Sequence, residues 1–96
     1  MNVRLLDAAQ DELEQYVEYY NRQQPGLGLE FAREIYRCID HVCENPLAWT
    51  QVSRRLRRAI PQRFRHGVLY RVENDTIIIV ALTHFRRHPN VWRERD

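Results

Sequence analysis

The sequence predicts one small α+β domain, residues 1–96, in which an N-terminal strand and a helical hairpin pack on one face of a small antiparallel sheet. Two observations predict this fold. The first half of the chain carries apolar residues at helical spacing in two segments, and the second half carries two β-branched, apolar segments around a tight turn. A chain of 96 residues builds a single core, and a composition of 44% hydrophobic residues is enough to fill it.

The first half of the chain is expected to hold the strand and both helices. Val3–Leu6 has the pattern of a short strand, and Asp7 has the pattern of an N-cap for a helix that runs over about residues 8 to 21. The turn at 22–26, which contains a Pro-Gly pair, ends that helix. The second helix ends at Asn45, because the residue before a proline leaves the α region. Its buried stripe is predicted to be Phe31, Ile35, Ile39 and Val42.

The second half is expected to supply the sheet. Arg54–Ala59 has the pattern of a charged strand, and Phe64–Val72 and Thr76–His84 are predicted strands joined by a hairpin at 73–75. The segment 77–82 is apolar at every position, so we expect it to be a central strand with both faces covered.

Two helices cover only one side of such a sheet. The other side is then expected to present Leu69, Ile78, Val80 and Leu82 beside Arg71. An exposed apolar strip with charged neighbours is typical of a protein-binding groove. The alternative is that the sheet curls, or that the C-terminal tail folds back over this face.

The charge of the chain is unevenly distributed. Residues 1–48 hold four arginines and nine acids, a net charge of −5, whereas residues 49–96 hold eleven arginines and four acids, a net charge of +7. All fifteen Lys and Arg residues are arginines, a bias that a GC-rich genome also produces. Genome composition does not, however, place arginines in one half of the chain and acids in the other. The guanidinium group of arginine forms bidentate hydrogen bonds with phosphates and carboxylates, so this half of the chain is predicted to bind another macromolecule.

The basic residues are expected to converge from the ends of neighbouring strands, which stand about 5 Å apart. The set predicted to form one patch is Arg54, Arg55, Arg57, Arg58, Arg65, His66, His84, Arg86, Arg87 and His88. Such a patch attracts phosphates, and a histidine or arginine within it is able to assist RNA cleavage by the substrate's own 2′-hydroxyl. A solvated charged face and a socket for an acidic partner remain open as alternatives.

Other chemistries are poorly supported by the sequence. His84 and His88 lack further ligands nearby, and Cys38, His41 and Cys43 stand at the wrong offsets for one site, so we predict neither a metal nor a cofactor. Nucleophilic catalysis has no motif, since the only serine lies outside any Gly-x-Ser-x-Gly pattern. The N-terminus lacks the pattern of a signal peptide and no apolar run is long enough to span a bilayer, which predicts a cytoplasmic protein without membrane contact. Two cysteines without disulfide spacing fit the same reducing compartment.

The C-terminal third resembles the RelE/ParE toxin superfamily. The resemblance is carried by the runs Phe64-Arg-His-Gly-Val-Leu-Tyr-Arg-Val, Thr76-Ile-Ile-Ile-Val-Ala-Leu-Thr-His and Arg86-Arg-His-Pro-Asn-Val-Trp-Arg-Glu-Arg, and the upstream helical hairpin matches the family layout. It implies the toxin half of a bacterial type II toxin–antitoxin pair. The cognate antitoxin would then cover the sheet face of Leu69, Arg71, Ile78, Val80 and Leu82.

The superfamily contains two activities, and departures from its pattern bear on both. RelE-like members cut mRNA on the ribosome with a strand arginine, a second arginine after the last strand and a tail tyrosine. The resemblance places these three groups at Gly67, Arg86 and Trp92. Gly67 therefore lacks the arginine side chain, and the indole of Trp92 does not exchange a proton as the phenol of a tyrosine does. Basic residues of an earlier strand would correspond to Arg57 or Arg58.

These departures favour the ParE-like branch, which resembles the nucleases in fold and poisons DNA gyrase. Three functions therefore remain: a gyrase-binding toxin, a ribosome-dependent and metal-independent mRNA endonuclease, and a non-toxic binding module. For a nuclease the candidate catalytic residues are Arg86, His84 and His66. Target or nucleic-acid contacts are predicted at Arg54, Arg55, Arg57, Arg58, Arg65, Arg87 and Trp92. The oligomeric state and the identity of the antitoxin are left open.

Overall fold

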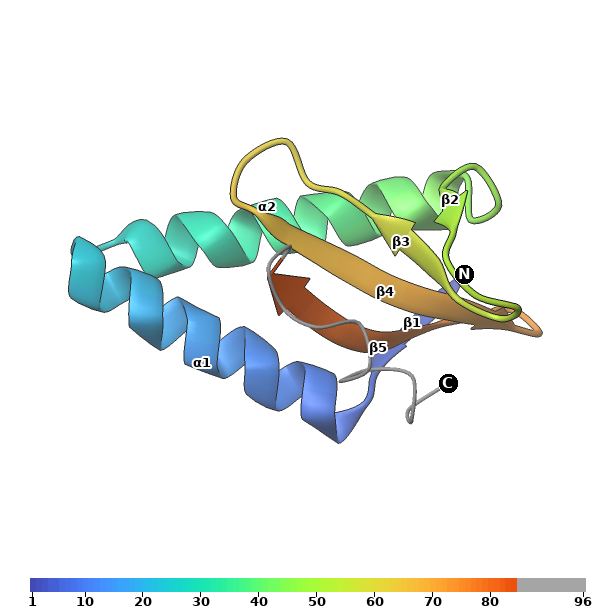
Figure 1. The fold of residues 1–96 in the computed structure, drawn as a ribbon, viewed down its shortest axis with the longest axis horizontal. Helices are drawn as coiled ribbons and strands as arrows, with labels where there is room; N and C mark the ends of the chain where they lie inside the picture. Colours follow the sequence, from blue (N-terminus) through green and yellow to red (C-terminus); the bar gives the residue numbers. More distant parts are fainter. Residues whose placement is uncertain (85–96) are drawn as a thin grey trace.

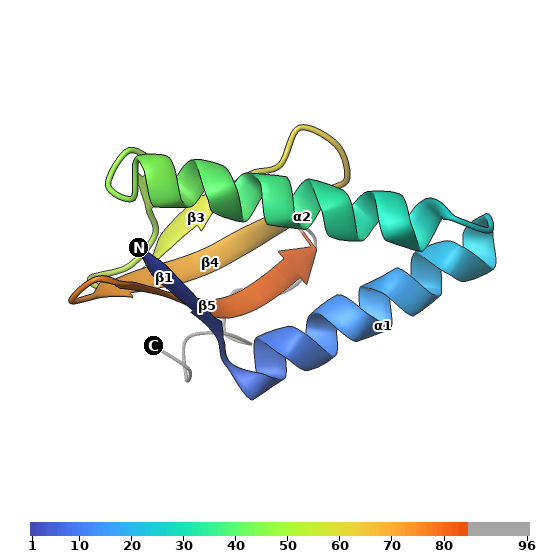
Figure 2. The same ribbon diagram turned by 180° about the vertical axis from the view of Figure 1, so that it is seen from behind.

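The computed structural model describes residues 1–84, and within them it has two helices on one face of a five-stranded sheet (Figure 1). The predicted α+β class is confirmed. Seen from behind, the helices lie in front of the sheet (Figure 2). The elements in chain order are β1 (Asn2–Leu5), α1 (Asp7–Gln23), α2 (Leu27–Glu44), β2 (Thr50–Gln51), β3 (Arg57–Ala59), β4 (His66–Glu73) and β5 (Thr76–His84). No helix of this part of the chain is long and apolar enough to cross a membrane.

The sheet has the strand order β1-β5-β4-β3-β2. β5 lies between two partners, as its apolar sequence predicts: it pairs antiparallel with β4 and parallel with β1. The parallel pair sets Asn2 opposite Thr76 and Leu5 opposite Ile79. The sheet is therefore mostly antiparallel, with one parallel edge strand contributed by the N-terminus.

α1 begins at Asp7, and its N-cap is Leu6, so the prediction that Asp7 caps the helix is wrong. The reason lies in the sheet. Leu6 continues β1 and donates its backbone N–H to the Ile79 carbonyl at 3.0 Å, which holds it in the extended conformation that a cap residue requires. Asp7 consequently enters the first helical turn, where its carboxylate suits the positive end of the helix dipole.

The two helices approach closely at their connection. Gly26 adopts a left-handed φ of 88° before α2, and Gly28 N–H donates to Asn21 Oδ1 at 2.8 Å. A Cβ atom at Gly28 would lie 2.3 Å from the Val17 carbonyl oxygen. The absence of a side chain at Gly28 is therefore what lets α2 start against α1.

β3 is shorter than the predicted strand Arg54–Ala59. Val52 and Ser53 both direct their N–H groups at the Leu56 carbonyl, and Leu56 N–H donates to Ser53 Oγ at 3.1 Å. These bonds form a tight turn between β2 and β3. The strand therefore starts only at Arg57.

β4 also starts later than predicted, at His66. Phe64 has a φ of 69°, which breaks the extended backbone, while its ring contacts Tyr20 and Phe31 at centroid distances of 4.9 and 5.2 Å. Ring packing against the helices thus takes the place of strand pairing at this residue.

A register shift in the β4–β5 ladder redistributes the apolar residues. Leu69 lies opposite Ala81 and Tyr70 lies opposite Ile79, so Val80 is the extra residue of a β-bulge. The alternation of β5 reverses there, which turns Leu82 to the helix side.

Buried side chains form one cluster on each side of the sheet. The helix-side core contains Ala9, Leu13, Phe31, Ile35, Cys38, Ile39, Val42, Ala59, Val68, Tyr70, Ile77, Ile79 and Leu82. The opposite cluster contains Leu56, Leu69, Ile78, Val80 and Ala81, with Leu6 and Val52 packed against it.

Candidate functional site

The two predicted catalytic histidines that the structure describes lie together. His66 begins β4 and His84 ends β5, and the two are register partners with ring centroids 5.2 Å apart. Two tyrosines of α1 close over His66. The hydroxyl oxygen of Tyr20 lies 2.8 Å from His66 Nε2, and the ring of Tyr16 stands edge-on with its centroid 4.3 Å from that of His66.

The surroundings of His66 keep its ring uncharged. The side chain is only 1% exposed, and burial, reinforced by the neighbouring His84, lowers the pKa of His66 to about 4. Burial together with Tyr19 and Tyr16 raises the pKa of Tyr20, so its hydroxyl keeps its proton. His66 is thus a neutral, buried ring near neutral pH.

A cavity of about 400 Å³ opens beside this pair. Within the described chain it is lined by Gln15, Tyr16, Tyr19, Tyr20, His66 and His84. The sequence predicts the two histidines at strand ends, but it does not predict the three tyrosines, because their helical spacing is equally that of ordinary core residues.

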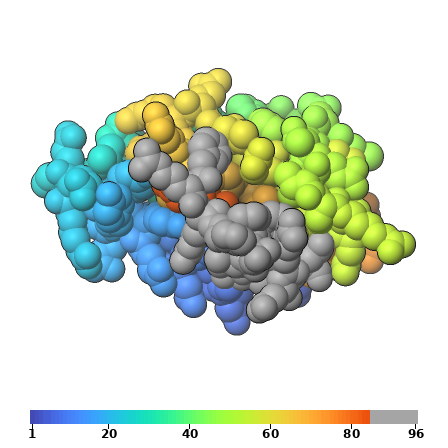
Figure 3. All heavy atoms as spheres, viewed as in Figure 1, coloured from blue at the N-terminus to red at the C-terminus, as the bar shows by residue number. Residues whose placement is uncertain are grey.

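The predicted arginine patch separates into distinct places. Arg54, Arg55, Arg57 and Arg71 line one cavity of about 260 Å³ at the β2–β3 edge. The segment that carries the first three lies on the yellow-green surface at one side of the molecule (Figure 3). Arg57 Nη1 donates to the Trp49 carbonyl at 2.7 Å, which fixes its side chain against the loop.

This cavity keeps an excess of positive charge. Glu73 forms ion pairs with both Arg55 and Arg71, with N···O distances of 3.5 and 3.4 Å, so one carboxylate lies beside two guanidinium groups. Arg58 is exposed and lies opposite Leu69 in the ladder, and Arg65 is exposed beside His66. Neither of these two lines the cavity, so the described arginines do not form the single patch that the sequence predicts.

The face predicted to receive an antitoxin is not an open apolar strip. Leu69, Ile78 and Val80 are 1%, 3% and 0% exposed and belong to the cluster around Leu56. Leu82 lies on the helix side of the sheet, for the bulge turns it there, and its backbone N–H donates to Glu12 Oε1 at 3.3 Å. The expectation that all these residues share one exposed face is therefore wrong. The alternative cover, the C-terminal tail, lies outside the described residues.

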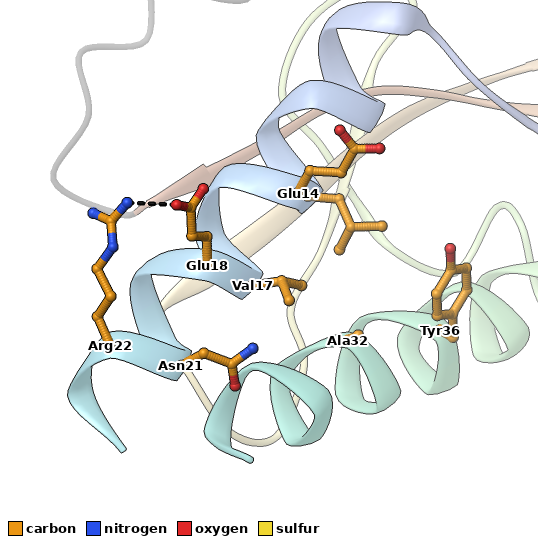
Figure 4. Close-up of a pocket in the computed structure, with 8 residues that line it drawn as sticks. Glu14, Val17, Glu18, Asn21, Arg22, Ala32 and Tyr36 are labelled. Atoms are coloured by element: carbon orange, nitrogen blue, oxygen red, sulfur yellow. Dashed lines mark hydrogen bonds and ion pairs between the residues drawn. The ribbon is translucent and has the colours of Figure 1, made fainter. Parts of the chain in front are cut away.

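A groove between α1 and α2 is a surface that the sequence does not predict (Figure 4). It has a volume of about 590 Å³ and an apolar floor to which Leu13, Val17 and Ala32 contribute. Glu14 and Glu18 line it from α1, where Glu18 forms an ion pair with Arg22 (Figure 4). The sequence signal for this groove is that Ala32 and Tyr36 widen the apolar stripe of the second helix beyond Phe31, Ile35, Ile39 and Val42.

Several predicted site residues fall beyond the described chain. Arg86, Arg87, His88 and Trp92 lie outside residues 1–84, so the structure assigns them no position. Within those residues no group of three or more His, Cys, Asp or Glu side chains is placed to hold a metal ion. Burial, together with Glu34, raises the pKa of the Cys38 thiol to about 12, which leaves that thiol protonated and unreactive.

Comparison with known proteins identifies the family. Residues 3–89 match the family described as ParE toxin of type II toxin-antitoxin system, parDE. No curated protein matches the chain. A solved structure described as the chromosomal ParDE TA system from P. aeruginosa is similar in fold: its TM-score is 0.77 at 17% sequence identity, over 88% of this chain and 95% of that one. Since the family match spans most of the sequence, the chain belongs to the ParE toxin family of type II toxin–antitoxin systems.

Proposed function

We propose that the chain is the toxin of a type II toxin–antitoxin module that arrests bacterial growth by binding DNA gyrase, and that a cognate antitoxin neutralises it. The family match over residues 3–89 is the observation that carries this proposal. The similar solved structure is described as a ParDE toxin–antitoxin system, which supports an antitoxin as partner. The proposal places the chain in the cytoplasm, where its target lies.

The preference for gyrase over mRNA cleavage rests on chemical groups that are missing. The resemblance to the RNA-cleaving members aligns Gly67, in β4, with their strand arginine, and Gly67 offers no side chain. His66, the nearest substitute, is buried and neutral. Neither residue is able to stabilise charge that develops on a scissile phosphate.

The arginine-lined cavity at the β2–β3 edge supports binding of a target without chemistry. Arg54 and Arg55 are exposed there, and Arg57 is held by the Trp49 carbonyl. Arginines that line a concave surface are typical of interfaces with acidic partners, whose docking they accelerate and orient.

A second candidate, a ribosome-dependent mRNA endonuclease, is favoured by one observation. His84 is only partly buried, borders the 400 Å³ cavity and adjoins His66, so it is placed as the accessible member of the pair. An acid–base role for His84 would need no metal. A third candidate, a non-toxic binding module, needs none of these groups.

The deciding experiment is pulse-labelling in bacteria after induction of the chain, with thymidine and methionine incorporation followed over the first minutes. We expect DNA synthesis to fall first and purified gyrase to lose supercoiling activity when the chain is added. An earlier fall in protein synthesis, with mRNA scission that His84→Ala abolishes, would instead establish the nuclease. Unchanged growth and unchanged incorporation of both labels would leave only the binding module.

A further inference from the structure

The cavity beside His66 has the features of a small-molecule site that the proposed function does not use. Its volume of about 400 Å³ falls in the range of ligand pockets. Tyr16, Tyr20 and His66 all line it, and each of the two tyrosine rings stands edge-on to the His66 ring. Aromatic walls of this kind favour a flat ring, which stacks on them or meets them edge-on.

One polar atom of a residue that lines the cavity has no hydrogen-bond partner among the described residues. His66 Nδ1 is buried and makes no hydrogen bond, although His66 Nε2 is engaged by Tyr20. If the Tyr20 hydroxyl donates to Nε2, the neutral imidazole carries its proton on Nδ1, and an N–H is left over. If Nε2–H donates to Tyr20, Nδ1 is a bare acceptor. Either tautomer therefore offers one unsatisfied hydrogen-bonding group, and leaving such a group buried costs about 1–3 kcal/mol.

The lining also limits the charge of a ligand. The described lining residues are tyrosines, histidines and Gln15, and none of them is Asp, Glu or Arg. A phosphate or a carboxylate in the cavity would give up its hydration without gaining an oppositely charged side chain from this wall. A plain hydrocarbon would leave His66 Nδ1 unsatisfied. The ligand that satisfies both limits is an uncharged flat ring with hydrogen-bonding groups on its edge.

We propose that the cavity lined by Tyr16, Tyr19, Tyr20, His66 and His84 binds a nucleobase, held between the tyrosine rings and hydrogen-bonded to His66 Nδ1. Nucleobases are uncharged flat heterocycles whose edges carry adjacent donors and acceptors. Stacking on aromatic side chains is the usual way in which proteins hold an unpaired base. The base is supplied either by a free nucleoside or by an unstacked nucleotide of a nucleic acid, since both present the same ring. This site is independent of gyrase binding, and it needs no cleavage of RNA.

The test is a titration of the purified full-length chain with adenosine, guanosine, cytidine and uridine, followed by the ¹⁵N resonances of the histidine side chains. We expect at least one nucleoside to shift the His66 Nδ1 resonance and to saturate with a dissociation constant of about 0.1–1 mM, as a ligand of this size allows. A single-stranded oligonucleotide of the same base distinguishes the sources. Tighter binding of the oligonucleotide assigns the base to a nucleic acid, and equal binding assigns it to a free nucleoside.

Variants of the lining residues test whether the nucleoside that shifts the His66 Nδ1 resonance binds in this cavity. His66→Gln keeps a polar atom near the Nε2 position for Tyr20 but removes Nδ1, and we expect about tenfold weaker binding. Tyr19→Ala truncates a ring that is 52% exposed, so the fold tolerates it, and it should weaken binding several-fold even if His66→Gln fails to fold. Tyr36→Phe, on the exposed side of α2 and outside this cavity, is the matched control and should change nothing.

Three results would overturn the proposal. One is the absence of any shift of His66 with all four nucleosides and with the oligonucleotides up to several millimolar. Another is equal binding by phenol, which would show an apolar cavity without recognition of a base edge. The third is unchanged nucleoside affinity in Tyr19→Ala and in folded His66→Gln. None of these results bears on gyrase inhibition, so the two proposals fail separately.

Discussion

Tyr20 on α1 and His66 on β4 are 46 residues apart in sequence, and a hydrogen bond of 2.8 Å joins the tyrosine hydroxyl to His66 Nε2. The bond ties the helical hairpin to the first residue of the strand that carries the family's pattern. Around it pack Tyr16, Phe31 and Phe64. This contact joins the two halves of the chain and also forms part of the wall of the proposed base site.

The first prediction tests that contact. Tyr20→Phe removes the hydroxyl and leaves both nitrogens of the buried His66 ring without a partner. We expect a loss of about 1–3 kcal/mol in the free energy of unfolding, measured by urea denaturation. Tyr19→Phe, whose ring is half exposed, is the control and should change stability by less than about 0.5 kcal/mol. Equal stability of the two variants would mean that the bond contributes nothing.

Stability should also depend on pH through His66. Its pKa is lowered to about 4 in the folded chain, mainly by burial, whereas the unfolded value is about 6.5. Between these values the unfolded chain binds more protons, so stability falls as pH falls from about 6.5 to 4 and is fully present above that window. The total effect is on the order of 3 kcal/mol. Urea denaturation at pH 7.5, 6 and 5 measures this loss of stability, and His66→Gln should remove it. If the stability of the variant fell with pH as much as that of the original chain, the effect would not come from His66.

The helical hairpin should be sensitive at Gly28. Gly28→Ala places a Cβ 2.3 Å from the Val17 carbonyl and 2.7 Å from the Asn21 side chain, so α2 must move away from α1. We expect a loss of about 1–3 kcal/mol, measured by thermal and chemical unfolding. Gly26→Ala is the control, because a Cβ atom there has no neighbouring atom within 4 Å but the backbone keeps a φ of 88°. It measures the cost of backbone strain without a steric clash, and we expect a loss of about 1 kcal/mol in stability. A Gly28→Ala chain of unaltered stability would show that the helices are not in close contact here.

The sheet face opposite the helices is a second core, which Leu69→Asp tests. The substitution places an unpaired carboxylate among Leu56, Ile78 and Val80, and we expect it to cost at least about 3 kcal/mol in stability. Val72→Asp, on the same strand but 37% exposed, is the matched control and should have little effect. Because Leu69→Asp disturbs the fold, its loss of antitoxin binding alone says nothing about where the antitoxin sits. Normal stability of Leu69→Asp would show that this face is open after all.

The arginine-lined cavity is tested by the double variant Arg54→Ala, Arg55→Ala. Both side chains are exposed, so stability should stay within about 0.5 kcal/mol of the original. If the cavity contacts gyrase, we expect about tenfold weaker inhibition of supercoiling, with the loss larger at low salt. Arg22→Ala removes an equally exposed arginine from α1 and should leave inhibition unchanged. Equal inhibition of gyrase by the original chain, the double variant and Arg22→Ala would show that this cavity does not contact gyrase.

The sequence was sufficient for the elements that depend on local pattern. Helical spacing predicted both helices, and the apolar run of Ile77–Leu82 predicted a central strand. The departures from prediction arise where a distant partner decides a residue's conformation. Leu6 takes the cap position from Asp7 because Ile79 holds it, and Phe64 leaves the strand because its ring packs on Tyr20 and Phe31.

By itself, the sequence determined the α+β class, the central strand and the resemblance that the family match confirms, since these follow from periodicity and from a contiguous motif. Only the tertiary structure decided which side chains meet. A bulge at Val80 moves Leu82 to the helix side, and a hairpin register brings His66 opposite His84. Such contacts depend on strand register and on packing between segments far apart in the chain, and a one-residue shift in either changes the face on which a side chain lies.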